Sequence, residues 1–424
     1  MKTRKRALVG LTVALALFGT AACGRAETTP GDQAPAQEVT EGAATGTLTV
    51  WAMGVEGEEL PGLVEGFKAE NPDVTVNVTA VPWDSAHDRF TAAIAAGTTP
   101  DVAQVGTTWM GEFVGLNALD PTPDLIDPSM FFEGAQSTTE VDGTSYAVPW
   151  YVETRLLYYR TDIAEAAGIT EAPATWDDLK AMATAMKGAE GVRWPISLLP
   201  GGTGSWQTVL PLMWSNGGQV VNDDQTAFTF DTPENVEALQ YYQSFFTEGL
   251  ANTAPTSGTT EADFVSGAVP MFISGPWMMS SVENLGGEGF ADQYAVAEMP
   301  TKVTNASFIG GSNLAVFSAS ENRDAAWKLV DYLTQEETQI EWFDMTSDLP
   351  SVQSAWDDAA LQSDEKLATF GAQLETAYAP PAIQTWEQVA NAFDAEVERV
   401  TITGSDAAAG LSALQQEATS IGMG

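Results

Sequence analysis

The chain has 424 residues and is strongly acidic, since 58 Asp and Glu stand against 17 Lys and Arg, for a formal net charge of −41. A surface this acidic repels nucleic-acid phosphates and anionic lipid headgroups, so nucleic-acid binding is excluded. The length favours two domains. Thirteen tryptophans with many carboxylates and amides are typical of a sugar site, where rings cover C–H faces and polar groups bind hydroxyls.

The N-terminus has the layout of an export signal. Basic residues cluster within residues 2–6, an apolar run covers residues 7–19, and small residues precede Cys23, the single cysteine of the chain. The apolar run is too short to span a bilayer comfortably. Residues 1–22 are therefore predicted to be a signal peptide.

The sequence TAACGRAE around Cys23 resembles the lipobox of bacterial lipoproteins, in which this thiol is acylated after export. The resemblance implies a palmitate-bearing anchor that holds the protein at the outer face of the cell membrane. Thr20 departs from the usual Leu, and an ordinary signal peptide with an incidental cysteine is the alternative. Residues 24–46 lack apolar periodicity, so residues 23–46 are predicted to be the lipidated cysteine and a flexible linker.

After the linker, strand and helix patterns alternate. Apolar residues from Leu60 to Phe67 recur at helical spacing, and Asn71-Pro72 ends that helix; a second helix runs from Asp84 to Gly97. Strands are expected over residues 47–53, 74–81 and 100–105. This alternation predicts a parallel sheet covered by helices.

A second α/β series begins at RLLYYRTD, residues 155–162. Thr175 and Asp178 have the spacing of a capping box, and Thr232-Pro233 opens a further helix. Residues 320–339 form one amphipathic helix in this interpretation, and the segment after Pro350 is mostly helical.

Eight stretches, in this order, resemble the extracellular solute-binding proteins of ABC transporters, in the maltose-binding-like family that serves oligosaccharide importers. They are GTLTVWAM, FKAENPDVTVNV, AAGTTPDVAQVGTTWMGEF, YAVPWYVETRLLYYRTDIAEAAGI, ATWDDLKAMA, SNGGQVV, FISGPW and AAWKLVDYL, within residues 46–350. The resemblance implies an α/β fold of two lobes, each a mainly parallel sheet flanked by helices, with the ligand held in the cleft between them.

The resemblance also implies where the lobes begin and end. Three crossovers are expected, near Glu153, Asn313 and Pro350. Lobe one comprises residues 46–152 and 312–349, and lobe two comprises residues 156–310 and 351–424.

One segment departs from the family pattern. The usual basic residue and Ala before GPW are replaced by Ala268 and Pro270. Because proline cannot donate a hydrogen bond to a sheet, the short strand there is expected to start at Pro270 or to lie at a sheet edge.

Four tryptophans are candidates for stacking on a ligand. Trp277 follows a short strand in a Gly-Pro turn, and Trp109 follows the strand VAQVG, where ligands sit in open α/β sheets. Trp206 after PGGTG and Trp386 in AIQTW are further candidates. For Trp277 and Trp109, a place in the core is the alternative. The tryptophans assigned to helix cores are Trp176 and Trp327.

The resemblance places Tyr151 and Glu153 at the floor of the cleft. Glu153 accepts sugar hydroxyls in this interpretation, and an ion pair with Arg155 is the alternative. The other polar candidates, each of which could instead be solvated or capping, are Glu56, Glu58, Asp84, Asp348 and the backbone amides of Gly311 and Ser312. His87 has no partner histidine, so neither a metal nor another cofactor is expected.

The function indicated is that of a monomeric, substrate-binding lipoprotein, not an enzyme, which captures an oligosaccharide by lobe closure and delivers it to ABC permease subunits. Two alternatives stay open. An exported glycosidase needs two carboxylates about 5–10 Å apart, and the same fold could bind a cation such as a polyamine, which rings and carboxylates also suit.

Overall fold

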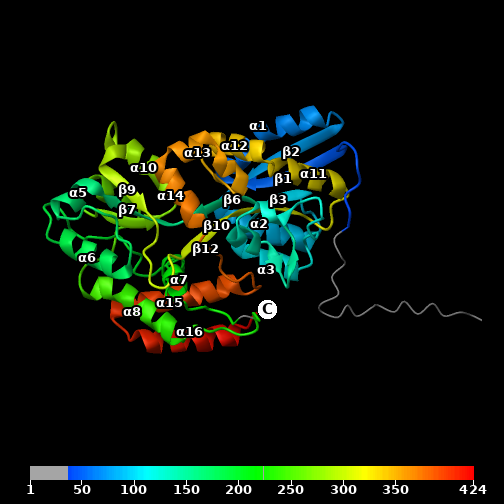
Figure 1. Cartoon of the computed structure of the whole chain (residues 1–424). Helices are drawn as coiled ribbons and strands as arrows, with labels where there is room; N and C mark the ends of the chain where they lie inside the picture. The colour runs from blue at the N-terminus through cyan, green and yellow to red at the C-terminus, as the bar shows by residue number, and fades with distance from the viewer. Residues whose placement is uncertain (1–36, 223) are drawn as a thin grey trace, which may run out of the picture. The chain divides into compact units, whose positions relative to one another are not determined.

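The computed structural model describes residues 37–222 and 224–424 (Figure 1). The signal peptide and Cys23 lie outside the described residues. The largest sheet has the strand order β11-β6-β10-β3-β1-β2, with β12 paired to β10. Its strands are β1 (Gly46–Met53), β2 (Val74–Val81), β3 (Val102–Gly106), β6 (Val148–Thr154), β10 (Ser307–Val316), β11 (Leu349–Pro350) and β12 (Ala377–Tyr378).

A second sheet has three strands in the order β8-β7-β9. The strands are β7 (Leu156–Arg160), β8 (Met271–Ser274) and β9 (Tyr294–Ala297). Only Arg155 separates β6 of the large sheet from β7 of this one. As the sequence predicts, β8 starts directly after Pro270 and is an edge strand. A hairpin is formed by β4 (Glu140–Val141) and β5 (Thr144–Ser145).

The α/β class is confirmed, but the strand directions differ from the expected mainly parallel sheets. In the large sheet β2 and β3 are parallel to β1, and β12 is parallel to β10, whereas β10 is antiparallel to β3 and β6. The three-stranded sheet is antiparallel throughout. Helix α10 (Trp277–Gly286) connects β8 to β9, which run in the same direction, but β7 is inserted between them. A helix that connects two strands predicts that the two strands run in the same direction. It does not predict whether a third strand lies between them.

The helices of the first α/β series lie beside β1, β2 and β3 (Figure 1). The predicted apolar face of α1, including Leu60 and Phe67, is buried, and Gly97 ends α2 in the left-handed conformation. The single helix expected over residues 320–339 is two helices, broken where the Thr334 hydroxyl bonds back to the Val330 carbonyl. These elements are α1 (Gly54–Glu70), α2 (Trp83–Ala96), α3 (Met110–Gly115), α4 (Glu133–Ser137), α11 (Arg323–Leu333) and α12 (Glu336–Thr346).

The remaining helices pack with the second series and the C-terminal segment. The capping box at Thr175 is confirmed, with the Asp178 amide donating to the Thr175 hydroxyl and the Asp178 carboxylate accepting in return. Trp176 and Trp327 are buried in cores, as predicted. The helices are α5 (Thr161–Ala166), α6 (Trp176–Met186), α7 (Trp206–Ser215), α8 (Pro233–Thr247), α9 (Thr260–Val265), α13 (Ala359–Ser363), α14 (Glu365–Leu374), α15 (Trp386–Thr403) and α16 (Ala407–Ile421), with short 3₁₀ turns at Thr107–Trp109, Pro128–Met130, Phe290–Gln293 and Gln353–Asp357.

Residues 37–45, which we call the N-terminal strap, are bound to the body rather than disordered as predicted for residues 24–46. The backbone amide and hydroxyl of Thr40 donate to the Asp324 carboxylate at 3.1 and 2.5 Å. The Arg323 guanidinium donates to the Gln37 carbonyl at 2.8 Å, and the buried Ala44 donates its amide to Asn71 at 2.7 Å. Composition failed here because most of these bonds use backbone groups of the strap, which every sequence has.

Among the described residues, no helix combines the length and the apolar character that crossing a bilayer requires.

Candidate functional site

A buried hydrogen-bond network surrounds Gln104, which is fully buried in β3. Its amide oxygen accepts from the Met53 amide at 2.6 Å, and its amide nitrogen donates to the Ser312 hydroxyl at 3.1 Å. The same nitrogen contacts Glu56 Oε1 at 3.3 Å and the Tyr151 hydroxyl at 3.4 Å. The ends of β1 and β3, the start of α1, and β6 and β10 thus contribute to one polar cluster.

Tyr151 and Glu56 form the shortest side-chain contact of this cluster. The Tyr151 hydroxyl donates to Glu56 Oε1 at 2.7 Å and accepts from the Ser312 hydroxyl at 3.2 Å. Burial and the negative charges of Glu56 and Asp348 raise the pKa of Tyr151 well above its usual value, so the phenol stays a donor. Three of the predicted residues are therefore brought together by the fold.

Glycines make the approach of these elements possible. A Cβ on Gly57 in α1 would lie 2.5 Å from the Ala52 carbonyl oxygen, so α1 can start against β1 only with glycine there. Gly311 in β10 has φ +119°, and its Cβ would lie 2.1 Å from the Tyr151 carbonyl oxygen. The predicted role of Gly311 and Ser312 was a pair of backbone amides, but the group that Ser312 contributes to the network is its hydroxyl.

Asp348, the residue before β11, is close enough to this cluster for the charge of Glu56 to change its pKa. Burial, followed by the charge of Glu56, raises the pKa of Asp348 to about 8. Its Oδ2 atom is buried and has no hydrogen-bond partner among the described residues. The side chain is thus mostly protonated at neutral pH, beside the side chains of Thr346 and Trp342.

Glu153 forms an ion pair with Arg155, the alternative that the sequence left open. The two guanidinium nitrogens Nη1 and Nη2 donate to the two Glu153 carboxylate oxygens, each at 3.1 Å. The Arg155 guanidinium also lies 4.7 Å from the ring centroid of Trp277, which is 45% exposed at the start of α10. Trp277 therefore presents a large apolar surface to solvent beside this pair.

A second exposed aromatic group lies near Glu56. Trp83, 42% exposed at the start of α2, was missed from the sequence, and its ring lies 6.3 Å from that of Trp109. A Cβ on Gly54 would meet the Trp83 ring at 2.7 Å and Glu56 Oε2 at 3.3 Å. The exposed indole and the carboxylate therefore flank the same glycine, and Pro82 before a helix start was the available signal.

Gln104 was also missed. It is one polar residue inside the apolar strand VAQVG, and a polar side chain in a buried strand needs partners. His87, the single histidine, pairs with Glu112 at 2.8 Å and packs against Trp109. No group of three metal-ligating side chains occurs in the described part of the chain.

Glu153 and Trp277, which contact Arg155, and Trp109, which packs against Trp83 and His87, lie outside the Gln104 network. Four further predicted residues also lie outside it. Trp206 and Trp386 are buried in an apolar core, where their rings meet edge to face at 5.3 Å. Glu58 is exposed near the start of α1, and Asp84 is exposed on the first turn of α2. Tryptophans at helix starts look alike in sequence whether the ring turns inward, as in Trp386, or outward, as in Trp83.

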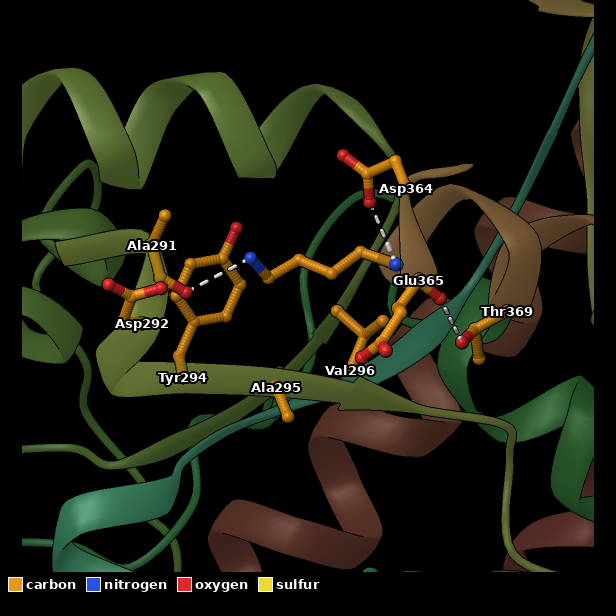
Figure 2. Close-up of a pocket in the computed structure, with 9 residues that line it drawn as sticks. Ala291, Asp292, Tyr294, Ala295, Val296, Asp364, Glu365 and Thr369 are labelled. Carbon is orange, nitrogen blue, oxygen red and sulfur yellow. Dashed lines mark hydrogen bonds between the residues drawn. The ribbon is translucent and has the colours of Figure 1, made fainter. Parts of the chain in front are cut away.

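A cavity of about 450 Å³ lies elsewhere, between β9 and the start of α14 (Figure 2). Figure 2 shows that its polar groups bond to one another: Lys366 Nζ donates to the Ala291 carbonyl at 3.0 Å, and the Lys366 amide donates to Asp364 at 2.8 Å. Lys366 also lies 4.4 Å over the Tyr294 ring. None of the predicted site residues lines this cavity, so the polar cluster is the better candidate.

Comparisons with known proteins agree with this fold. Residues 53–340 match the sequence profile of the family described as bacterial extracellular solute-binding protein. A Brucella abortus protein named only as a binding protein is 31% identical over 335 residues, which cover 77% of this chain and 80% of the relative. The maltotriose-binding protein of Pyrococcus abyssi is 26% identical and covers 78% of this chain and 73% of its own length.

A solved structure is similar over nearly the whole described chain. The sugar-binding protein MalE from Xanthomonas citri superposes with a TM-score of 0.84 at 31% identity, over 89% of this chain and 97% of that one. The relatives and the fold are those of solute-binding proteins, not of enzymes. The chain belongs to the family of bacterial extracellular solute-binding proteins.

Proposed function

We propose that this protein captures an oligosaccharide between two lobes and delivers it to the permease subunits of an ABC importer. The observation that carries the proposal is the buried cluster of hydroxyl and carboxyl groups around Gln104, together with the exposed indoles of Trp83, next to Gly54 and Glu56, and of Trp277, next to the Glu153–Arg155 pair. Rings of this kind cover sugar C–H faces, and groups such as Glu56 and Asp348 bind hydroxyls. The maltotriose-binding and MalE relatives support the sugar class.

The lobes that we propose are residues 46–152 with 312–349 and residues 156–310 with 351–424. The change of sheet at Arg155 supports the first boundary. On this division the cluster around Gln104 belongs mainly to lobe one, and Trp277 belongs to lobe two. A ligand that contacts both favours the closed form, because only that form allows both sets of contacts.

The expected free energies of stacking and hydrogen bonding suffice for a dissociation constant in the micromolar range. If each sugar face removes roughly 80 Å² of apolar ring surface from water, about 2 kcal/mol follows per face at ~25 cal/mol/Å². Two faces, with hydrogen bonds to the buried cluster, can reach the roughly 8 kcal/mol of micromolar affinity.

Anchoring completes the proposal. Acylation of Cys23 after export would attach the chain to the outer face of the cell membrane, and the protein would act there as a monomer. Mass spectrometry of the protein from membranes tests this: a diacylated N-terminal Cys23 is expected, and a free N-terminus at another residue contradicts it.

The binding proposal is tested by titrating a chain that begins at Gln37, which keeps the N-terminal strap, while following tryptophan fluorescence. The panel consists of α- and β-linked disaccharides and trisaccharides, including maltotriose, with spermidine and an amino-acid mixture as controls. A saturable change with one sugar class, insensitive to salt, is expected. A response to spermidine alone, weakened by salt, would instead identify a cation-binding protein of the same family.

A further inference from the structure

Arg155 occupies the single residue between the two sheets and is held there on several sides. Its guanidinium forms a two-point ion pair with Glu153, and Nη2 also donates to Gln207 Oε1 at 3.2 Å. The side chain of Arg155 is only 14% exposed. A planar guanidinium group bonded in this way has a fixed orientation as well as a fixed position.

Two aromatic rings lie against this fixed plane. The Arg155 Cζ atom is 4.7 Å from the ring centroid of Trp277 and 5.5 Å from that of Phe308. Phe308 is buried, whereas nearly half of Trp277 is exposed. One face of the Trp277 ring is therefore covered by a largely buried cation, while nearly half of the residue is open to solvent.

Two glycines make room for the arrangement. A Cβ on Gly275 would lie 2.1 Å from the Trp277 ring and 2.7 Å from Arg155 Nη1, and a Cβ on Gly310 would lie 2.6 Å from Glu153 Oε1. Neither glycine has a positive φ. What glycine supplies at both positions is space, since their backbone conformation is open to any residue.

We infer that Arg155 is a positioning residue, which Glu153 and Gln207 hold in place and which orients the Trp277 ring before a ligand arrives. The covered face fixes the ring, and the open face is the one presented for stacking. Glu153 then serves the site through Arg155 rather than by accepting ligand hydroxyls. The orientation of the ring needs no ligand, whereas its use in stacking rests on the proposed function.

The orientation of the Trp277 ring, which needs no ligand, is tested by measuring the rotational freedom of that ring. In each background, time-resolved fluorescence anisotropy of the protein is compared with that of its Trp277→Phe version, so that the difference isolates this indole. Arg155→Met should add a fast, large-amplitude decay and increase acrylamide quenching, and Arg155→Lys should do so to a smaller extent. Gly275→Ala, with Arg155 intact, should also free the ring by displacing it.

The matched control is Arg89→Met. Arg89 lies over the Trp51 ring at 4.3 Å, so this change removes the same kind of guanidinium–indole contact away from Trp277. It should leave the Trp277 difference signal unchanged. Circular dichroism reports whether Arg155→Met folds. If it folds and the Trp277 signal stays as in the wild type, the inference is overturned. If it does not fold, an unchanged Trp277 signal in both Arg155→Lys and Gly275→Ala overturns the inference.

The binding part uses maltotriose as the probe. Arg155→Met should weaken its affinity about three- to tenfold, because the ring must then be ordered during binding. An equal affinity in wild type and variant, together with a freed ring, would contradict the role in binding. Absence of maltotriose binding to the wild type would count against that choice of sugar and leave the anisotropy result to decide the orientation.

Discussion

At the scale of single residues, the site combines groups that sequence reasoning finds easily with groups that it does not. Glu56 was predicted from its position, Tyr151 from the family resemblance and Ser312 for its backbone amide; their side chains meet through Gln104, which was not predicted. Its amide connects them because one side chain both donates and accepts. Which face of β3 it occupies follows from strand register, and the sequence alone does not determine that register.

Asp348 predicts a dependence of stability on pH. Its pKa of about 8 lies above the usual 3.8, so the folded chain holds this proton more tightly than the unfolded chain. The unfolded chain loses the proton first as pH rises, and the free energy of unfolding therefore falls between pH 4 and 8, by at most about 1.4 kcal/mol per pH unit.

Asp348→Asn should remove this contribution. Urea unfolding from pH 4 to 8 is expected to show a variant close to the wild type at pH 4 and increasingly more stable towards pH 8. Asp344→Asn, an exposed carboxylate on α12, is the control for removing a charge. A stability difference that is the same at every pH would contradict the assignment.

At the scale of elements, helices with clear apolar periodicity formed at the predicted places, although residues 320–339 fall into two helices, whereas the N-terminal strap did not follow its composition. Its bonds to Asp324, Arg323 and Asn71 involve mainly its backbone groups, and its apolar contribution is small. The Thr40 bonds lower the pKa of Asp324. They are therefore stabilising at neutral pH and are lost as Asp324 is protonated in acid.

Removing the strap should destabilise the body. A chain that starts at Gly46 is expected to unfold at lower urea than one that starts at Gln37, by about 1–3 kcal/mol, since the buried Ala44 and the partners of Thr40 are lost. Thr40→Ala in the longer chain should account for part of that loss. Equal midpoints for the two chains would mean that the strap is not bound in solution.

At the scale of the whole molecule, the order and spacing of eight motifs predicted the fold, because together they define the succession of elements through both sheets. They did not define the direction of pairing around β7. The motifs also could not separate buried indoles such as Trp386 from exposed ones such as Trp277, because that depends on contacts between distant segments.

Closure on a ligand is a prediction about the whole molecule. Small-angle scattering of the chain from Gln37 should give a radius of gyration that decreases on addition of the sugar identified by titration, towards the roughly 21 Å of a compact chain of this length. Trp277→Ala should weaken the effect at a fixed sugar concentration. A radius that stays constant at saturation would contradict capture by closure.

The central place of β7 also sets the order in which the chain can fold. Leu157 pairs with Ile273 on one side and with Ala297 on the other, and β10 joins Val102 to Val316 in the large sheet. Neither sheet is complete until most of the chain is available, and such distant pairings form slowly, over milliseconds to seconds. On the proposed export from the N-terminus, the large sheet is therefore completed only after its last strand, β12, has emerged, and the core is completed only with α15 and α16 behind it.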